Sequence, residues 1–128
     1  MSKAIVYGSL REGMYNAASF QRTYGTGYNK IGEATLEGYK LFSLGTYPFV
    51  SESLATSDEL KVDIYECSEE CFDSIDRMEL GAGYETRDIN VIDNEGVSHE
   101  GRIYVMTGMN EESYTQVEDG DWVNYKTT

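Results

Sequence analysis

Glu79 has the most unusual predicted setting of any carboxylate in the chain. It lies in the segment 68–84, SEECFDSIDRMELGAGY, which has the pattern of a short amphipathic helix. Phe72, Ile75 and Met78 mark the apolar face of this helix. Glu79 follows Ile75 by four residues and therefore projects from the apolar side. Partial burial and the helix C-terminus both raise a carboxylate pKa, as a general base working near neutrality requires. The alternative, favoured on spacing alone, is a frayed last turn with this glutamate in water.

The proposed helix has recognisable ends. Ser68 is a natural N-cap, and Glu69 and Glu70 occupy the first turn, where the helix dipole favours negative charge. Gly81 and Gly83 are expected to end the helix. The sequence thus predicts the carboxylate in the last helical turn, where the dipole disfavours an anion.

A second candidate site follows the first predicted strand. Residues 4–7, AIVY, are typical of a strand, and the loop GSLREG at 8–13 leads into a helical stretch near 16–22. A glycine-containing turn between a strand and a helix presents free backbone N–H groups, which can hold an anion. The loop lacks the G-K-[ST] and G-x-G-x-x-G patterns of nucleotide-binding loops. The alternative is an ordinary strand-to-helix turn.

The cysteines and the histidine do not indicate a metal or a nucleophilic site. Cys67 and Cys71 are four residues apart, and His99, the only histidine, is distant in sequence. A zinc site needs more ligands of this kind. We expect two reduced thiols that act as small core residues, and a histidine on the surface of a polar hairpin.

Composition narrows the class of protein. A length of 128 residues with 40% hydrophobic residues is typical of one globular domain, spanning 1–128. The formal charge of -13 repels phosphate groups, so binding to nucleic acid or an anionic membrane is not expected. The sequence has no long apolar run, and its first residues lack a signal-peptide core, so we expect a cytoplasmic protein.

The hydrophobic pattern predicts about six strands and short helices. In the segment 59–66, Leu60, Val62 and Ile64 alternate with a second set of side chains, which predicts a half-buried strand with that second set exposed (Lys61, Asp63 and Tyr65). Pro48, the only proline, indicates a sheet edge or the wall of a cleft. Asp93 to Gly96 form a hairpin turn, and a short element packed by Trp122 is expected near the end. The predicted fold is α+β: a mixed, closed or nearly closed small β-barrel flanked by short helices. The remaining strands are predicted at 4–7, 30–36, 38–44, 86–93 and 101–106.

Four segments, in order, resemble the γ-glutamylcyclotransferase-like superfamily, and the γ-glutamylamine cyclotransferase branch with its bacterial relatives in particular. They span nearly the whole chain. One departure is Leu80, where relatives usually have a glycine, so the turn after the glutamate is expected to be reshaped. The four segments are VYGSLREGMYN at 6–16, IDRME at 75–79 with Tyr84 and Arg87 following, GRIYV at 101–105, and GDW at 120–122.

The resemblance implies an enzyme that cyclises a small γ-glutamyl amide or γ-glutamylamine to 5-oxoproline and releases the amine. It implies Glu79 as the general acid and base, and neither a metal nor a cofactor. The pocket would lie beside the loop at the end of the first strand, where backbone N–H groups would hold substrate oxygens. Arg11 either attracts an anionic substrate or forms a surface ion pair. The implied substrate-binding residues are Tyr7, Gly8, Ser9, Leu10, Tyr84 and Tyr104.

Two other functions remain open at this point. The fold could instead carry a non-catalytic module that binds a small molecule or a partner, because a fold does not determine a function. An enzyme acting on a γ-glutamyl group of a carrier protein or a biosynthetic intermediate is the third possibility. The retained Glu79 favours catalysis. The sequence indicates neither the leaving amine nor the oligomeric state.

Overall fold

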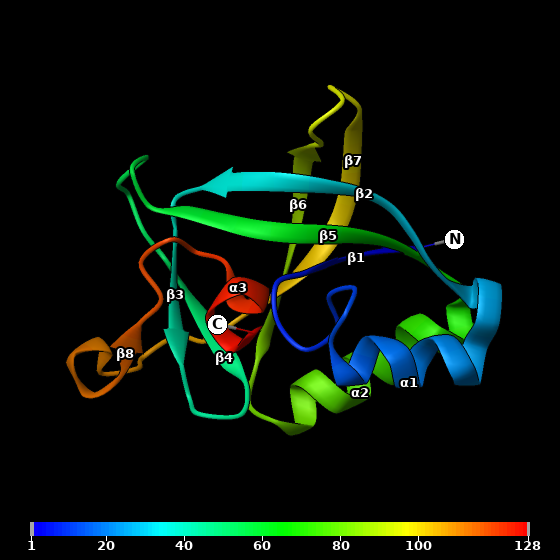
Figure 1. The fold of residues 1–128 in the computed structure, drawn as a ribbon, viewed down its shortest axis with the longest axis horizontal. Coiled ribbons are helices and arrows are strands. Elements are labelled where there is room, and N and C mark those ends of the chain that lie inside the picture. The colour runs from blue at the N-terminus through cyan, green and yellow to red at the C-terminus, as the bar shows by residue number, and fades with distance from the viewer. Residues whose placement is uncertain (1, 128) are drawn as a thin grey trace.

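The protein is described by a computed structural model that covers residues 2–127. Eight strands and three α-helices, with two short 3₁₀ turns, form one α+β arrangement (Figure 1). The elements are β1 (Ser2–Val6), α1 (Tyr15–Tyr24), η1 (Gly25–Gly27), β2 (Tyr28–Glu37), β3 (Tyr39–Ser43), β4 (Pro48–Glu52), β5 (Glu59–Cys67), α2 (Glu69–Gly81), β6 (Glu85–Ile92), β7 (Ser98–Val105), η2 (Glu111–Ser113), β8 (Thr115–Gln116) and α3 (Trp122–Thr127).

The larger sheet is mixed and has the strand order β2-β5-β1-β7-β6. Strand β1 lies at its centre, antiparallel to β5 and parallel to β7. Strands β6 and β7 form the predicted hairpin around Asp93 to Gly96. The loop that follows β1 therefore emerges from the middle of the sheet, on the side where α1 and α2 lie (Figure 1).

The smaller sheet has the order β4-β3-β8 and joins the end of the larger one. The N–H of Met106, just after β7, donates to the carbonyl of Val50 in β4 at 3.1 Å. Pro48 is the first residue of β4, an edge strand, where its missing N–H costs no ladder hydrogen bond. The prediction of an edge position for this proline is confirmed.

The sequence predicts a closed or nearly closed barrel in an α+β fold; the mixed sheet of this fold class is present, but within residues 2–127 the sheets are not closed. In the described chain the strand ladder does not continue from β2 to β6, and the two edges meet only at one end, where the N–H of Asn94 donates to Glu33 O at 2.8 Å. The count of six strands was also too low, because β4 and β8 were missed. Strand β8 has only two residues, too few for an alternating pattern to indicate it.

Strand β1 is buried on both faces and divides two hydrophobic cores. Ala4 and Val6 belong to the core beneath α1 and α2, whereas Ile5 belongs to the core that contains Trp122. A strand covered on both faces is continuously apolar, as the run AIVY is.

Strand β5 corrects one sequence-based expectation. Asp63 and Tyr65, predicted on an exposed face, are each only 1% exposed. Tyr65 stacks on Tyr28 with ring centroids 3.9 Å apart, and the loop after β1 covers Asp63. The strand therefore has two covered faces although its sequence alternates, because the second face is lined by polar and amphipathic side chains.

Helix α2 begins as predicted. The Ser68 hydroxyl accepts a hydrogen bond from the Cys71 N–H at 3.2 Å, and Glu69 and Glu70 occupy the first turn. Ile75 is fully buried on the face that packs against the larger sheet. This packing fixes the rotation of the helix and therefore the direction of every side chain in its last turn.

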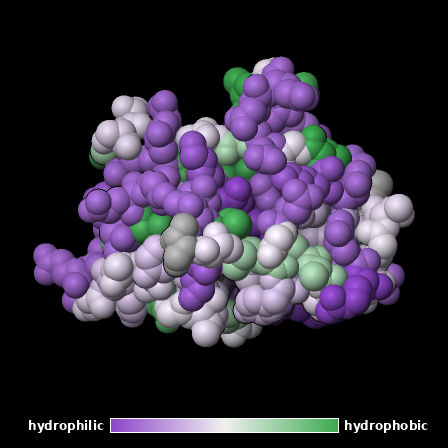
Figure 2. Space-filling model, in the orientation of Figure 1, coloured by the Kyte–Doolittle hydropathy of each residue, from purple (hydrophilic) through white to green (hydrophobic). Residues whose placement is uncertain are grey.

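No helix within residues 2–127 has both the length and the apolar character needed to span a lipid bilayer. The face shown in Figure 2 is mostly hydrophilic, in keeping with 23 acidic residues against 10 basic ones.

Candidate active site

A cavity of about 210 Å³ lies between the end of β1, the start of α1, β4 and the last turn of α2. The structure brings all seven sequence-predicted site residues to this cavity, although their roles remain predictions. Pro48 forms part of its wall, as the sequence predicted for a cleft. The lining residues are Ile5, Val6, Tyr7, Gly8, Ser9, Leu10, Tyr15, Asn16, Tyr47, Pro48, Met78, Glu79, Ala82, Tyr84 and Tyr104.

Among the described residues, Glu79 is the only acidic one that lines the cavity. Its carboxyl group has no hydrogen-bond or ion-pair partner among residues 2–127, and burial raises its pKa from 4.5 to about 7. A carboxyl group with this pKa exists in both protonation states near neutrality, so it can accept a proton and return it. The alternative of a solvent-exposed glutamate is therefore wrong. The following residue, Leu80, is 53% exposed and does not line the cavity.

The loop after β1 turns its carbonyl groups away from the cavity. Gly8 O accepts from the Arg11 N–H at 3.0 Å, Ser9 O from the Ala17 N–H at 3.1 Å, and Leu10 O from the Tyr28 hydroxyl at 2.6 Å.

The N–H groups of the same three loop residues have no acceptor in the described chain. The Ser9 hydroxyl oxygen accepts a hydrogen bond from the Asn16 amide at 2.8 Å, so its proton is also available. The loop thus offers several hydrogen-bond donors to the cavity, which suits carboxylate or carbonyl oxygens.

The three tyrosines that were predicted at the site have hydroxyl groups that cannot donate to the cavity, because each one already donates to a protein acceptor. The Tyr7 hydroxyl donates to the backbone carbonyl of Tyr104 at 2.7 Å. The Tyr84 hydroxyl donates to the carbonyl of Pro48, and the Tyr104 hydroxyl donates to the carboxylate of Asp76. Each hydroxyl proton is therefore committed to the protein, and each oxygen is left with acceptor capacity only.

Glu79 lies close enough to these tyrosines to affect their ionisation. The pKa values of Tyr7, Tyr84 and Tyr104 are all raised, mainly by burial, and the charge of Glu79 is a further cause in each case. The Tyr7 oxygen also accepts the backbone N–H of Val50, so Glu79 and the phenolic oxygens of Tyr84 and Tyr104 are the acceptors left on the cavity wall.

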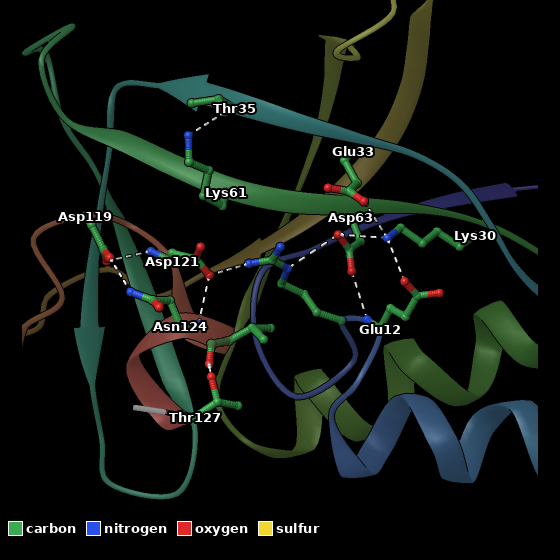
Figure 3. Close-up of polar contacts among 12 residues, drawn as sticks. Glu12, Lys30, Glu33, Thr35, Lys61, Asp63, Asp119, Asp121, Asn124 and Thr127 are labelled. Carbon is green, nitrogen blue, oxygen red and sulfur yellow. Dashed lines mark hydrogen bonds and ion pairs between the residues drawn. The ribbon is translucent and has the colours of Figure 1, made fainter.

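A buried ion-pair network holds the loop in place (Figure 3). Asp63, on β5, accepts a hydrogen bond from the Glu12 N–H at 2.8 Å and pairs with Arg11 at 3.4 Å. Arg11 also reaches Asp121 at 3.0 Å, and Lys30 lies 3.7 Å from Asp63. The Arg11 side chain is 11% exposed, does not line the cavity and forms ion pairs, so the structure favours the ion-pair alternative in a largely buried position. Arg11 ties the loop to β5 and to the segment before α3.

The histidine and the two cysteines do not line the cavity. His99 is buried, with its Nε2 atom 2.8 Å from Asp93 Oδ2, so the predicted surface position is wrong. The hairpin is polar, but this acidic partner compensates the buried imidazole. Cys67 and Cys71 are buried free thiols, as predicted. Within residues 2–127, no group of histidine, cysteine and acidic side chains is arranged to hold a metal ion.

Sequence reasoning did not assign site positions to Tyr15, Asn16 and Tyr47. Asn16 ends the family-like segment 6–16, which is the sequence signal that could have indicated it, and the structure places it in the first turn of α1 with its amide donating to Ser9. Tyr15 and Tyr47 are 61% and 42% exposed, and no local pattern distinguishes them from other surface tyrosines.

The model of the family "Gamma-glutamyl cyclotransferase, AIG2-like" matches residues 4–124. The chain belongs to this family. The match includes the loop, the glutamate and the three tyrosines described above. The superfamily resemblance noted in the sequence is thereby confirmed.

Individual relatives within or near this family are distant in sequence. A provisionally named gamma-glutamylcyclotransferase of Pyrococcus horikoshii, PH0828, is 33% identical over 79 residues, which is 62% of this chain and 60% of that protein. Its crystal structure superposes with a TM-score of 0.73 over 99% of this chain and 94% of that one, at 24% identity. An AIG2-like protein of Mus musculus gives a TM-score of 0.72 at 21% identity, covering 88% and 81% of the two chains. These structural likenesses establish the fold, and the sequence match spans about three fifths of the relative.

Proposed function

We propose that this protein cyclises a γ-glutamyl amide or γ-glutamylamine to 5-oxoproline and releases the free amine. The observation that carries the proposal is the pairing, in one cavity, of a partnerless carboxyl group of pKa about 7 with a loop of free N–H groups. Membership of the cyclotransferase family supports the same reaction class.

In this reaction the substrate's own α-nitrogen attacks its γ-carbonyl carbon. A nitrogen–carbon bond forms and closes a five-membered ring, and the bond between that carbon and the amide nitrogen breaks. Because nucleophile and electrophile belong to one molecule, correct folding of the substrate supplies a large part of the acceleration, on the order of several kcal/mol. The largely apolar cavity would favour this compact conformation.

Proton balance assigns the role of Glu79. The attacking nitrogen starts as an ammonium group and loses two protons in total, and the leaving nitrogen gains two. A carboxylate that accepts each proton and returns it to the leaving amine balances the reaction. With a pKa of about 7, Glu79 is suited to both steps. The reaction consumes no water.

The loop would bind the substrate's oxygens. The N–H groups of Gly8, Ser9 and Leu10 are free to donate to the α-carboxylate or to the γ-carbonyl oxygen, where negative charge develops during attack. Leu10 and the apolar part of Tyr7 would pack against the methylene chain of the glutamyl group. Tyr84 would complete the wall opposite β1.

The test is incubation with a panel of γ-glutamyl amines, γ-glutamyl dipeptides and ε-(γ-glutamyl)-lysine, with detection of 5-oxoproline and the freed amine. Glu79→Gln is expected to reduce turnover at least about a hundredfold while the fold is retained. Glu70→Gln, on the exposed face of the same helix, is the matched control and should retain full activity. Full activity of the Glu79 variant would remove this residue from the mechanism. Binding of a panel member by wild type without any product would instead favour a non-catalytic module.

A further inference from the structure

The Tyr104 hydroxyl is held by a carboxylate outside the cavity. Asp76 lies on α2, three residues before Glu79, and its Oδ1 atom accepts the Tyr104 proton. Its Oδ2 atom accepts a hydrogen bond from Arg102 Nη1 at 2.8 Å. A carboxylate paired with a guanidinium has no proton to give, so the tyrosine is necessarily the donor in this contact. Asp76 itself does not line the cavity.

Arg102 has two further contacts that hold its guanidinium in place. Its hydrogen bond to Asp76 can therefore run in only one direction, from the guanidinium to the carboxylate. Its Nε atom donates to Asp88 at 3.0 Å, and its guanidinium lies 5.1 Å from the centre of the Phe72 ring. Arg102 can only donate, Asp76 can only accept, and Tyr104 must direct its proton outward. The phenolic oxygen then presents only lone pairs to the cavity.

We propose that Asp76 is a positioning residue that makes the oxygen of Tyr104 a fixed acceptor for the α-ammonium group of the substrate. The inference rests on the proposed function and adds the means by which the cavity distinguishes the two charged groups on the α-carbon of the glutamyl unit. The loop offers donors, which suit the carboxylate. Tyr104, together with Glu79, offers acceptors, which suit an ammonium group with three protons to donate.

The isosteric change Asp76→Asn separates polarity from packing. Arg102 needs an acceptor oxygen, so the amide oxygen of the new side chain should face the guanidinium and the NH₂ group should face Tyr104. The tyrosine oxygen would then accept from the amide, and its proton would turn toward the cavity. A donor would replace an acceptor at the ammonium site without a change in side-chain volume.

The test measures affinity rather than turnover, in a Glu79→Gln background that prevents cyclisation. Titration calorimetry at pH 6 gives the Kd of γ-glutamylethylamide and of its des-amino analogue, N-ethylglutaramate. The ratio of the two Kd values measures how strongly the cavity prefers the ammonium group. Adding Asp76→Asn should lower this preference about tenfold, mainly by raising the Kd of the ligand that carries the ammonium group. A purely structural role would weaken both ligands equally and leave the ratio unchanged.

Two further variants complete the design. Asp88→Asn removes the negative charge of the exposed partner of Arg102 and should leave the preference within about twofold. Tyr104→Phe removes only the phenolic oxygen and should lower the preference as much as Asp76→Asn, with no further loss in the double variant. The tyrosine variant also tests the inference if the aspartate variant fails to fold.

An unchanged preference in both Asp76→Asn and Tyr104→Phe, with γ-glutamylethylamide still bound, would overturn the role of Asp76 and leave the proposed reaction intact. If neither wild type nor the Glu79→Gln protein bound γ-glutamylethylamide, and the substrate panel gave no product, the proposed function would fail together with this inference.

Discussion

Replacing Glu79 by glutamine should stabilise the protein, and the gain should depend on pH. The carboxyl group is half-buried and has no partner among residues 2–127, and burial raises its pKa from 4.5 to about 7. The folded state therefore binds this proton more tightly than the unfolded state does. The stability associated with the proton is fully present below about pH 4.5 and is lost as the pH rises toward 7. Glutamine has no charge to bury and does not incur this loss.

The magnitude follows from the pKa values. A pKa raised from 4.5 to about 7 corresponds to about 3 kcal/mol of unfolding free energy, at about 1.4 kcal/mol for each pH unit. The difference between Glu79→Gln and wild type should be near zero at pH 4, about 1 kcal/mol at pH 5 and about 3 kcal/mol at pH 8. Any constant effect of the amide group would shift all three values equally.

Urea unfolding followed by tryptophan fluorescence provides the assay. Trp122 is fully buried, so unfolding exposes the chain's single tryptophan to water. Glu70→Gln is the control, because Glu70 is exposed in the first turn of α2, where its charge is mildly favourable. That variant should be destabilised by less than about 1 kcal/mol. If the Glu79 variant differed from wild type by the same amount at pH 5 and pH 8, the reasoning from burial would be refuted.

Three other predictions concern activity and the backbone. The pH profile of kcat/KM should rise with an apparent pKa near 7, because the free enzyme needs Glu79 ionised; a profile flat from pH 5 to 8 would contradict this. Gly8→Ala places a Cβ atom 2.9 Å from the Pro48 ring, so kcat/KM should fall at least about tenfold while stability falls by about 1 kcal/mol, as steady-state kinetics and urea unfolding would measure. Gly120→Ala combines a φ of +66° with a Cβ atom 1.9 Å from Glu59 O, and thermal unfolding should show a loss of about 3 kcal/mol or more.

Local features of the candidate site were predictable because they depend on short stretches of chain. The N-cap at Ser68 and the apolar face through Ile75 fix the register of α2, and this register determines where Glu79 points. The loop after β1 was also recognisable, since a glycine turn between a strand and a helix leaves N–H groups free. The resemblance to a known family then indicated that these two segments meet.

Long-range contacts could not be read from the sequence. The Nδ1 atom of buried His99 lies 3.2 Å from Lys3 Nζ, which is 96 residues away in the chain, and the burial of Asp63 depends on Arg11, which is 52 residues away. Periodicity also treats each strand separately, so it does not indicate whether the two edges of a sheet join. The open sheet edges at β2 and β6, and the carboxylate of Asp76 behind Tyr104, required the structure.

Because β1 lies at the centre of the larger sheet, that sheet can form only after the later strands that pair with β1 have been synthesised. This strand is synthesised before its neighbours, yet it pairs with β5, about 60 residues later, and with β7, about 100 residues later. Contacts between such distant segments slow folding and leave the early apolar strand exposed on the ribosome. A nascent chain must therefore keep this strand from aggregating until β7 has emerged. Because the loop after β1 continues directly from this strand, the candidate cavity is completed only in this last stage of synthesis.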